Sequence, residues 1–465
     1  MREHWPLNKA GGSGEIAVIG LARSGRAVAM LLARGGSQVY ASDAGRTPEL
    51  EATAAELERE GVGAQVGAHD LDRIGRAALV VVSPGVSPDA PAIAVARQKK
   101  IDVVSEIDIA LRFLPGLRYI AVTGTNGKTT TTALVAHLLQ SLRFRAPAAG
   151  NIGTALSEIA LQPEIPQWVA LEVSSYQLHD TPGIRPTVGI VTNLSPNHLD
   201  RYRSVEDYYA DKKLLFRNAT AASHWVTNAD DADVQALAAG VPGVHARFST
   251  AGRADAYFNR TTEQLMVLGS PLIRRAELKL LGDHNVANAL CAALAVMLAD
   301  AANRTTDACM HLAEGLRSFR SLEHRNEVVG ETSGVLWIND SKSTNVASTL
   351  VALRGMSRPT ILLLGGRHKG EPYKELASEI ERTVKLVIAY GEASPLIVRD
   401  LTGVVPVEEG GSSFPDVVAR ARQAAAPGDA ILLSPACSSF DMFANYEHRG
   451  AEFKRLAGAS MASSA

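Results

Sequence analysis

The chain has 465 residues, and at about 150 residues per domain it is expected to contain more than one domain. Hydrophobic residues make up 46% of it and charged residues 21%, a composition that excludes a disordered or collagen-like chain. The 47 Lys and Arg nearly balance the 49 Asp and Glu, so nothing favours a nucleic-acid partner.

The cysteines and the apolar runs indicate the cellular compartment of the protein. Cys291, Cys309 and Cys437 form no CxxC pair, so neither a zinc site nor a disulfide framework is implied. The first residues lack the apolar core of a signal peptide, and the apolar stretch 289–302 is shorter than the ~20 residues that span a bilayer. We therefore expect a cytoplasmic protein with no membrane span.

The first third of the chain, residues 1–115, alternates short apolar strands with helical patterns. Strands are expected at 16–20, 38–42 and 79–83, a βαβ rhythm that predicts a Rossmann-like domain with a parallel sheet. The first strand enters a glycine turn, 20–25, whose following helix could hold a phosphate. Ala22 interrupts the dinucleotide fingerprint G-x-G-x-x-G, so a tight turn without a ligand is an equal alternative. Asp43 ends the next strand, where a nucleoside-binding acid is expected.

The central third, residues 116–321, opens with the strongest local signal in the chain. Strand 117–123 enters a glycine loop, and an apolar helix leaves it. The loop consists of Gly124, Thr125, Asn126, Gly127, Lys128, Thr129 and Thr130. Its N–H groups can wrap a β-phosphate, Lys128 can reach the β/γ oxygens and Thr129 can ligate Mg²⁺. It is a shortened Walker loop, because the full spacing needs glycine at Val122, and it predicts a P-loop domain that binds a nucleoside triphosphate.

A metal-bound phosphate also needs a carboxylate at a neighbouring strand end. Glu172 lies near the exit of the apolar strand 168–173 and can supply it. The alternative is a solvated acid at the rim of the sheet.

Two further candidates follow strand 188–194. His198 comes after the C-terminal end of this strand, where ligands collect in α/β sheets, although a plain loop histidine is the alternative. A helix is predicted from Ser204 as N-cap, and its apolar stripe contains Lys212. Such a lysine can snorkel to water. If it is instead buried beside cations, its pKa falls, and the neutral amine can react with CO₂ to a carbamate that binds a second Mg²⁺.

The last third, residues 322–465, predicts a second Rossmann-like domain with strands at 335–338, 360–364, 384–390 and 430–433. A helix is expected over 440–456, directly after Ser438 and Ser439. Three α/β domains result.

The order and spacing of short motifs along nearly the whole chain resemble the Mur ligase family. The motifs are Gly20–Gly25, Ser83–Gly85, Gly124–Thr130, Gly150–Gly153, Leu171–Gln177, His198–Tyr202, Asp211–Leu214, Gly282–Asn288, Glu323–Arg325, Asn339–Asn345, Leu363–Lys369 and Ser434–Ser439.

The resemblance implies an ATP-dependent ligase that adds D-glutamate to UDP-N-acetylmuramoyl-L-alanine during peptidoglycan precursor synthesis. It implies that Lys128 and Thr129 bind ATP and its Mg²⁺, that Glu172 binds the same ion, and that His198 and a carbamylated Lys212 hold a second Mg²⁺. The implied nucleotide contacts are Asn285, Asn288, Arg325 and Asp340. The implied contacts of the UDP substrate are Gly20, Arg23, Ser24, Gly25, Asp43, Ser83, Gly85 and Asn151. The implied glutamate contacts are Lys342, Thr344, Lys369, Ser439 and Tyr446.

The glutamate pocket has a physical rationale of its own. Lys369 follows Gly365-Gly366 and offers charge to a carboxylate, while Ser439 at a helix start offers hydrogen-bond donors. A solvated loop lysine and a plain helix N-cap are the alternatives. Asn326 and the pair Arg367-His368 depart from the family pattern nearby.

The expected reaction transfers the γ-phosphoryl group of ATP to the acceptor carboxylate, and the glutamate amine then attacks the acyl phosphate. We expect the C-terminal domain to close and bring Arg325 and Lys342 over the phosphates. His198 is the nearest candidate base, but that role stays unassigned. We expect a monomer with small-molecule partners only. The alternatives are a ligase of the same family for another amino acid, a dehydrogenase and a non-catalytic nucleotide sensor.

Overall fold

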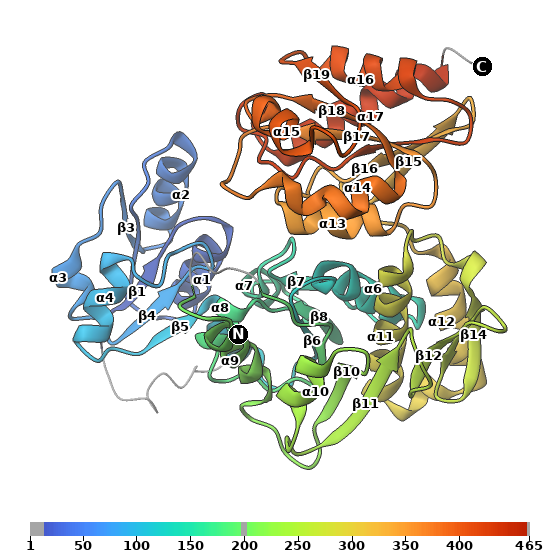
Figure 1. Cartoon of the computed structure of the whole chain (residues 1–465). Coiled ribbons are helices and arrows are strands. Elements are labelled where there is room, and N and C mark those ends of the chain that lie inside the picture. The colour runs from blue at the N-terminus through green and yellow to red at the C-terminus, as the bar shows by residue number, and fades with distance from the viewer. Residues whose placement is uncertain (1–13, 197–201, 463–465) are drawn as a thin grey trace. The chain divides into compact units, whose positions relative to one another are not determined.

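The structure is a computed structural model that describes residues 14–196 and 202–462. It divides into two compact units, one formed by residues up to 277 together with 287–317, the other by 278–286 together with the chain from 318 onward. Three sheets organise these units (Figure 1). No helix in the described part of the chain is long and apolar enough to cross a membrane.

The first sheet is parallel, with the strand order β3-β2-β1-β4-β5. Its strands are β1 (Ile16–Ile19), β2 (Val39–Asp43), β3 (Gly63–Val66), β4 (Leu79–Val82) and β5 (Val103–Ser105), and its helices are α1 (Arg23–Arg34), α2 (Pro48–Arg59), α3 (Leu71–Ile74), α4 (Pro91–Gln98) and α5 (Glu106–Phe113). The order reverses between β1 and β4, and the glycine turn after β1 lies at this switch point, where α/β sheets bind ligands.

The first two sheets share a hydrophobic core. Side chains of α3 and α4 pack on one face of the first sheet, whereas α1 and α5 pack on the other face. The core beneath α1 and α5 continues through α7 (Leu156–Ala160) to β6 and β8 of the second sheet. This continuity explains why both sheets belong to one unit.

The second sheet has nine strands in the order β14-β13-β12-β11-β10-β9-β6-β8-β7. They are β6 (Arg118–Thr123), β7 (Ala148–Gly150), β8 (Trp168–Glu172), β9 (Val188–Val191), β10 (His224–Asn228), β11 (Val244–Ser249), β12 (Ala256–Asn259), β13 (Gln264–Val267) and β14 (Ser270–Arg274). The helices of this region are α6 (Lys128–Ser141), α8 (Ser175–His179), α9 (Val205–Lys213), α10 (Ala232–Ala238), α11 (Asp283–Ala299) and α12 (Thr306–Ser318). Because β6 pairs in parallel with β8 on one side and β9 on the other, the segments that follow these three strands meet at one edge.

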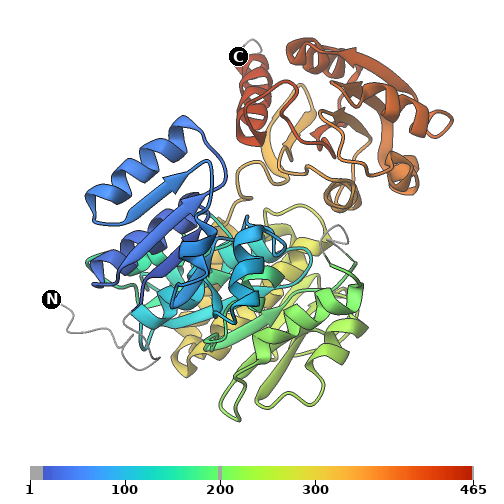
Figure 2. The same cartoon turned by 90° about the vertical axis from the view of Figure 1, so that its left-hand side faces the viewer.

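The third sheet is doubly wound, as expected for a Rossmann-like domain. Its order is β15-β16-β20-β17-β18-β19, with β15 alone antiparallel to its neighbour. Its strands are β15 (Glu327–Thr332), β16 (Val335–Asn339), β17 (Thr360–Gly365), β18 (Val384–Tyr390), β19 (Val407–Gly411) and β20 (Ala430–Leu433), and its helices are α13 (Val346–Arg354), α14 (Ala377–Thr383), α15 (Ser394–Leu401), α16 (Phe414–Ala424) and α17 (Tyr446–Ala462). Leu362 and Leu364 pack with α13, α14 and α15, whereas Ile361 and Leu363 pack with α16 and α17 on the opposite face. Figure 2 shows helices on both faces of this orange and red sheet.

The strands predicted from apolar runs are confirmed, with ends that differ by a few residues. The predicted start of the last helix is wrong, because α17 begins at Tyr446. Residues 440–445 form a turn, in which the Ser439 carbonyl accepts the N–H groups of Met442 (3.1 Å) and Phe443 (2.8 Å). The side chain of Asn445 accepts the His448 N–H at 2.7 Å and thereby caps the helix. Ser439 therefore opens this turn and does not cap a helix.

Candidate active site

The glycine loop 124–130 follows β6 and leads into α6, as predicted. Gly124 has φ +141°, and a Cβ there would lie 2.0 Å from Thr192 Oγ1. Gly127 has φ +80°, and a Cβ there would lie 2.6 Å from Asn288 Oδ1. Both positions therefore require glycine, for backbone conformation and for space. The loop therefore leads directly into the N-terminus of α6, where free backbone N–H groups can bind a phosphate.

Asn193, just beyond β9, holds this loop from the side. Its amide oxygen accepts the Asn126 N–H and its amide nitrogen donates to the Asn126 carbonyl, both at 2.9 Å. Its own carbonyl accepts the Thr125 N–H at 2.9 Å, and Thr192 Oγ1 donates to the Asn126 carbonyl at 2.7 Å. Asn193 was not predicted from the sequence, since Asn126 lies 67 residues away and no local pattern connects the two.

Two lysines converge on the same loop. The Lys128 ammonium donates to the carbonyls of Gly124 (3.0 Å) and Thr125 (2.9 Å). Lys212, which is 1% exposed, donates to the Gly124 carbonyl at 2.7 Å and lies 4.5 Å from the centre of the Tyr208 ring. Burial and the neighbouring charge of Lys128 lower the pKa of Lys212 well below its ordinary value. The snorkelling alternative for Lys212 is therefore wrong.

The helix that presents Lys212 begins as predicted. The Ser204 hydroxyl accepts the Asp207 N–H at 3.1 Å and caps α9. Lys212 stands in the last turn of this helix, on the same face as Tyr208. His198 lies outside the described residues, so its predicted roles stay predictions.

Glu172 ends β8 beside the loop and is 1% exposed, so it is not a solvated rim acid. Its Oε1 accepts the side-chain amide of Asn151 at 2.9 Å. Its Oε2 is buried and has no hydrogen-bond partner among the described residues. A buried carboxylate oxygen without a donor is costly unless a cation meets it, so this donor set fits Mg²⁺. Within the described residues no three His, Cys, Asp or Glu side chains cluster as a ready-made metal site.

A cavity of about 620 Å³ lies at the switch point of the first sheet. It is lined by seven of the eight residues that the resemblance assigns to the UDP substrate, which are Gly20, Arg23, Ser24, Asp43, Ser83, Gly85 and Asn151. Gly25 is absent from its lining but is needed for the turn, because a Cβ there would lie 1.7 Å from the Gly20 carbonyl oxygen. Asn151 at the edge of this cavity donates to Glu172, which pairs in the sheet with Val122, two residues before the phosphate loop.

Several of these residues already hold the turn together. Asp43 accepts the N–H groups of Leu21 and Gly45, each at 2.8 Å, and Ser83 donates to the Gly20 carbonyl at 2.9 Å. Arg23 forms a bidentate pair with Glu158 of α7, at 2.8 and 2.9 Å. His69 also lines the cavity and pairs with Ser42 at 2.9 Å; it belongs to no recognisable motif and was missed.

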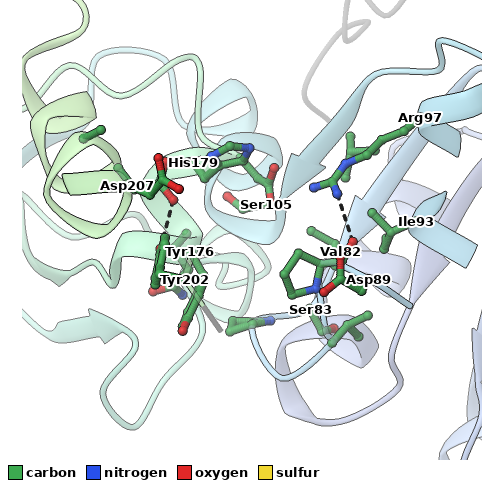
Figure 3. A pocket seen from close by; sticks show the side chains of 18 of the residues that line it. Val82, Ser83, Asp89, Ile93, Arg97, Ser105, Tyr176, His179, Tyr202 and Asp207 are labelled. Carbon is green, nitrogen blue, oxygen red and sulfur yellow. Dashed lines mark hydrogen bonds and ion pairs between the residues drawn. The ribbon is translucent and has the colours of Figure 1, made fainter. Parts of the chain in front are cut away.

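A second cavity, of about 540 Å³, lies on the other side of the Ser83-Pro84 turn. Figure 3 shows Tyr176 and Tyr202 on one wall and Ile93 and Arg97 on the opposite wall. The tyrosine rings are stacked with 5.2 Å between their centres, and Tyr202 donates to Asp211 at 2.9 Å. The turn that is expected to take the UDP substrate therefore separates two cavities.

The four implied nucleotide contacts belong to different units. Asn288 lies in the first unit and accepts the hydroxyl of Thr131 at 3.2 Å. Asn285, Arg325 and Asp340 lie in the second unit. Asp340 is buried and accepts the Asn326 N–H (3.1 Å) and the Ser434 hydroxyl (2.8 Å), and burial raises its pKa to about 6.

The five implied glutamate contacts gather within the second unit. Lys369 donates to the hydroxyl of Thr344 at 3.2 Å, and the Lys342 ammonium lies 5.3 Å from the centre of the Tyr446 ring. Arg367 and Ser438 exchange backbone hydrogen bonds of 2.9 and 3.2 Å, which brings the loop of Lys369 beside Ser439.

The departures from the family pattern have local explanations. Asn326 has φ +43°, a left-handed conformation that asparagine tolerates better than apolar residues do. The Arg367 side chain pairs with Glu392 at 3.1 Å, and His368 pairs with the Tyr373 hydroxyl at 2.9 Å. Neither departure replaces one of the implied glutamate contacts.

Comparison with known families covers the chain in three parts. Residues 14–105 match the N-terminal domain model described as Mur ligase MurD-like, residues 122–296 match the Mur ligase middle domain, and residues 324–437 match the Mur ligase glutamate ligase domain.

Individual proteins are similar over nearly their whole length. The UDP-N-acetylmuramoylalanine–D-glutamate ligase of Myxococcus xanthus is 40% identical, with 95% of this chain and 97% of that protein aligned. The enzyme of that name from Cytophaga hutchinsonii is 35% identical, with 96% and 98% aligned. Among solved structures, UDP-N-acetylmuramate-alanine ligase from Thermotoga maritima superposes with a TM-score of 0.60 at 21% identity, covering 96% of this chain and all of that one, which shows a shared fold.

Proposed function

The chain belongs to the Mur ligase family of ATP-dependent amide ligases, and on that premise we propose that it joins D-glutamate to UDP-N-acetylmuramoyl-L-alanine through an acyl phosphate. The product is a precursor of peptidoglycan. We place the reaction in the cytoplasm, where ATP and nucleotide-linked sugars are available, and propose that the three sheets mark an acceptor domain (1–115), an ATP domain (116–321) and a glutamate domain (322–465).

One observation supports this proposal most strongly. The acceptor cavity, the carboxylate of Glu172 and the phosphate loop are connected through Asn151, whose side chain lines the cavity and donates to Glu172 at 2.9 Å. A substrate that fills the cavity with its nucleotide end can therefore present its far end to the loop. A terminal carboxylate delivered there meets the γ-phosphate of ATP.

The chain's own residues promote phosphoryl transfer by position and charge. The N–H groups of the glycine loop bind the β-phosphate. The Lys128 ammonium stabilises the negative charge that spreads over the oxygens of the γ-phosphoryl group during transfer. Asn193 keeps the loop in this conformation through its contacts with Asn126. Asn151 orients the acceptor carboxylate for attack on the γ-phosphorus.

Mg²⁺ would be held by Thr129 and Glu172, with a second ion held by His198 and a carbamylated Lys212. When bound, these ions neutralise phosphate charge. The low pKa of Lys212 supports carbamylation, because the neutral amine is the form that reacts with CO₂.

The second half of the reaction forms the amide. Lys369 and Lys342 attract the carboxylates of glutamate, and Ser439 and Thr344 offer hydroxyl groups to them. The deprotonated amine attacks the acyl carbon, and phosphate leaves with the electron pair of the broken C–O bond. Closure of the C-terminal domain and the identity of the base stay predictions.

The experiment that tests the proposal is phosphate release by the purified protein with ATP and UDP-N-acetylmuramoyl-L-alanine. D-glutamate, L-glutamate, meso-diaminopimelate and L-lysine are each added in turn. We expect turnover with D-glutamate alone. Turnover with another amino acid would assign the chain to a different ligase of the family, and phosphate release that no amino acid accelerates would contradict ligation.

A further inference from the structure

Arg449 is a fully buried arginine in the first turn of α17. Its exposed fraction is 0%, and its side chain is among the largest that the protein buries completely. Neither the sequence motifs nor the glutamate contacts considered above include it. A guanidinium stays charged at every physiological pH, so the fold keeps a permanent positive charge inside the C-terminal domain.

The guanidinium contacts three separate loops. Its Nε donates to the Ser341 hydroxyl at 3.0 Å, and its Nη2 donates to the carbonyls of Ser341 (2.9 Å) and Cys437 (3.2 Å). Its Nη1 packs against Gly366, where a Cβ would lie 3.2 Å away. The same Ser341 hydroxyl donates onward to the Tyr446 carbonyl at 2.8 Å.

Each of these loops carries a residue expected to bind the amino acid. Ser341 precedes Lys342, Gly366 begins the segment that leads to Lys369, and Cys437 stands two residues before Ser439. The partners of Arg449 therefore all lie one to three residues from an implied glutamate contact.

We propose that Arg449 is the positioning residue of the glutamate site, an inference that rests on the function proposed above. It fixes the spacing of the three loops, and its charge attracts the dicarboxylate substrate. The substrate is then contacted by side chains on these loops, which are Lys342, Thr344, Lys369 and Ser439. Arg449 itself does not contact the substrate but holds the loops in place.

A purely structural role explains the residue poorly. A cation in the first turn of a helix opposes the helix dipole, so Arg449 is not there to stabilise α17. All three of its acceptors are uncharged, and the buried Tyr390 hydroxyl beside the guanidinium is uncharged as well. An apolar side chain of similar size would fill the space without the desolvation cost of a charge. A positive charge is useful at this place if an anion binds nearby.

The planar fork of arginine is also necessary. It directs donors to the 341 and 437 loops at fixed angles, which the single ammonium of lysine cannot do. Lysine would preserve the charge but not the spacing of the loops. The two parts of the proposal can therefore be separated with two substitutions.

The test compares Arg449→Lys and Arg449→Met with the wild-type protein in steady-state ligation at varied D-glutamate. Arg455→Met is the matched control, because Arg455 lies on the same helix, is 64% exposed and pairs with Glu452. We expect the KM for D-glutamate to rise about tenfold or more in Arg449→Met and less in Arg449→Lys. The control should stay within about twofold of wild type.

A second readout excludes general damage. Hydroxylamine traps the acyl phosphate that forms from ATP and the acceptor before any amino acid binds, and its yield should be the same in all four proteins. An unchanged KM for D-glutamate in both Arg449 variants would overturn the proposal, as would an equal loss of trapping and ligation. If Arg449→Met does not fold, the KM of Arg449→Lys decides in the same way. Failure of the proposed function would instead appear as absent ligation by the wild-type protein.

Discussion

The phosphate loop and the glutamate site are built in opposite ways. The loop is one continuous segment, 124–130, whose glycines set its path, while its lateral support comes from Thr192, Asn193 and Lys212. The glutamate site is assembled from the segments 341–344, 366–369 and 437–439 together with Tyr446, and its hydrogen bonds join residues as far as 108 positions apart. Recognition of a phosphate by backbone N–H groups needs only a local conformation, whereas a dicarboxylate must be met by side chains from several directions.

Substitution of Lys128 should give the largest effect and should separate the two regions. The Lys128 ammonium is expected to stabilise the negative charge on the transferring phosphoryl group. Lys128→Ala removes this cation and should lower kcat/KM on the order of a thousandfold. Lys213→Ala, an exposed lysine one residue after Lys212, is the control. D-glutamate should still protect the Lys128→Ala variant from thermal unfolding as it protects wild type. Undiminished ligation by Lys128→Ala would remove the loop from the mechanism.

Asn193 tests whether the continuous loop depends on support from outside. Asn193→Ala removes two hydrogen bonds to Asn126, each worth about 1 kcal/mol, so the KM for ATP should rise roughly tenfold or more. Asn218→Ala is a matched control, since the Asn218 amide also donates to two backbone carbonyls, Pro182 and Ile184, each at 2.8 Å. Equal KM values for ATP in both variants would show that Asn193 is no more than another half-buried amide.

Lys369 tests the assembled site. Lys369→Met removes a charge that is expected to meet a substrate carboxylate, and the KM for D-glutamate should rise about tenfold while the KM for ATP stays unchanged. Lys374→Met, on the short helix that follows the loop, provides the control. Equal increases in the KM for D-glutamate and the KM for ATP would mean that Lys369 is not a specific contact of the amino acid.

The last prediction concerns stability, at the contact that joins the first two sheets. Glu106 is buried, its carboxylate accepts the Ser157 N–H, and burial raises its pKa to about 7 from 4.5. Between these values the folded protein binds a proton that the unfolded chain has lost, so the free energy of unfolding falls as pH rises from about 4.5 to 7. Glu106→Gln resembles the protonated form, and its stability relative to wild type should increase by roughly 2–3 kcal/mol between pH 5 and pH 8. Denaturant unfolding at both pH values measures this difference, and a constant difference would contradict the raised pKa.

The sequence predicted those parts of the fold that local patterns determine. The parallel strands with long apolar runs, the glycine loop and the Ser204 cap were found because apolar runs, glycine spacing and capping residues act over a few positions. The strands β10 to β14 were missed, as were β3, β5, β7, β15 and β19, because most of them are short and have no continuous apolar run; of the strands β10 to β14 only β14 lies at a sheet edge.

The site residues that escaped prediction act at long range. Asn193 and Arg449 look like a loop amide and a helix arginine until the fold brings Asn126, Ser341 and Cys437 to them. The glutamate contacts came from the resemblance, and Lys369 alone would pass for a loop lysine. The residues around the glycine turn before α1 were predicted as substrate contacts. Their structural role was not predicted, because the hydrogen bonds by which Asp43 and Ser83 hold the turn appear only in the fold.

The central claim is that the phosphate loop activates the acceptor carboxylate by phosphorylation. The most direct test uses UDP-N-acetylmuramoyl-L-alanine labelled with ¹⁸O in its terminal carboxylate and follows the label by mass spectrometry during ligation to D-glutamate. The account predicts that each phosphate released carries one labelled oxygen, because the carboxylate oxygen that attacks the γ-phosphorus leaves with the phosphate. Unlabelled phosphate alongside normal formation of the amide would contradict it.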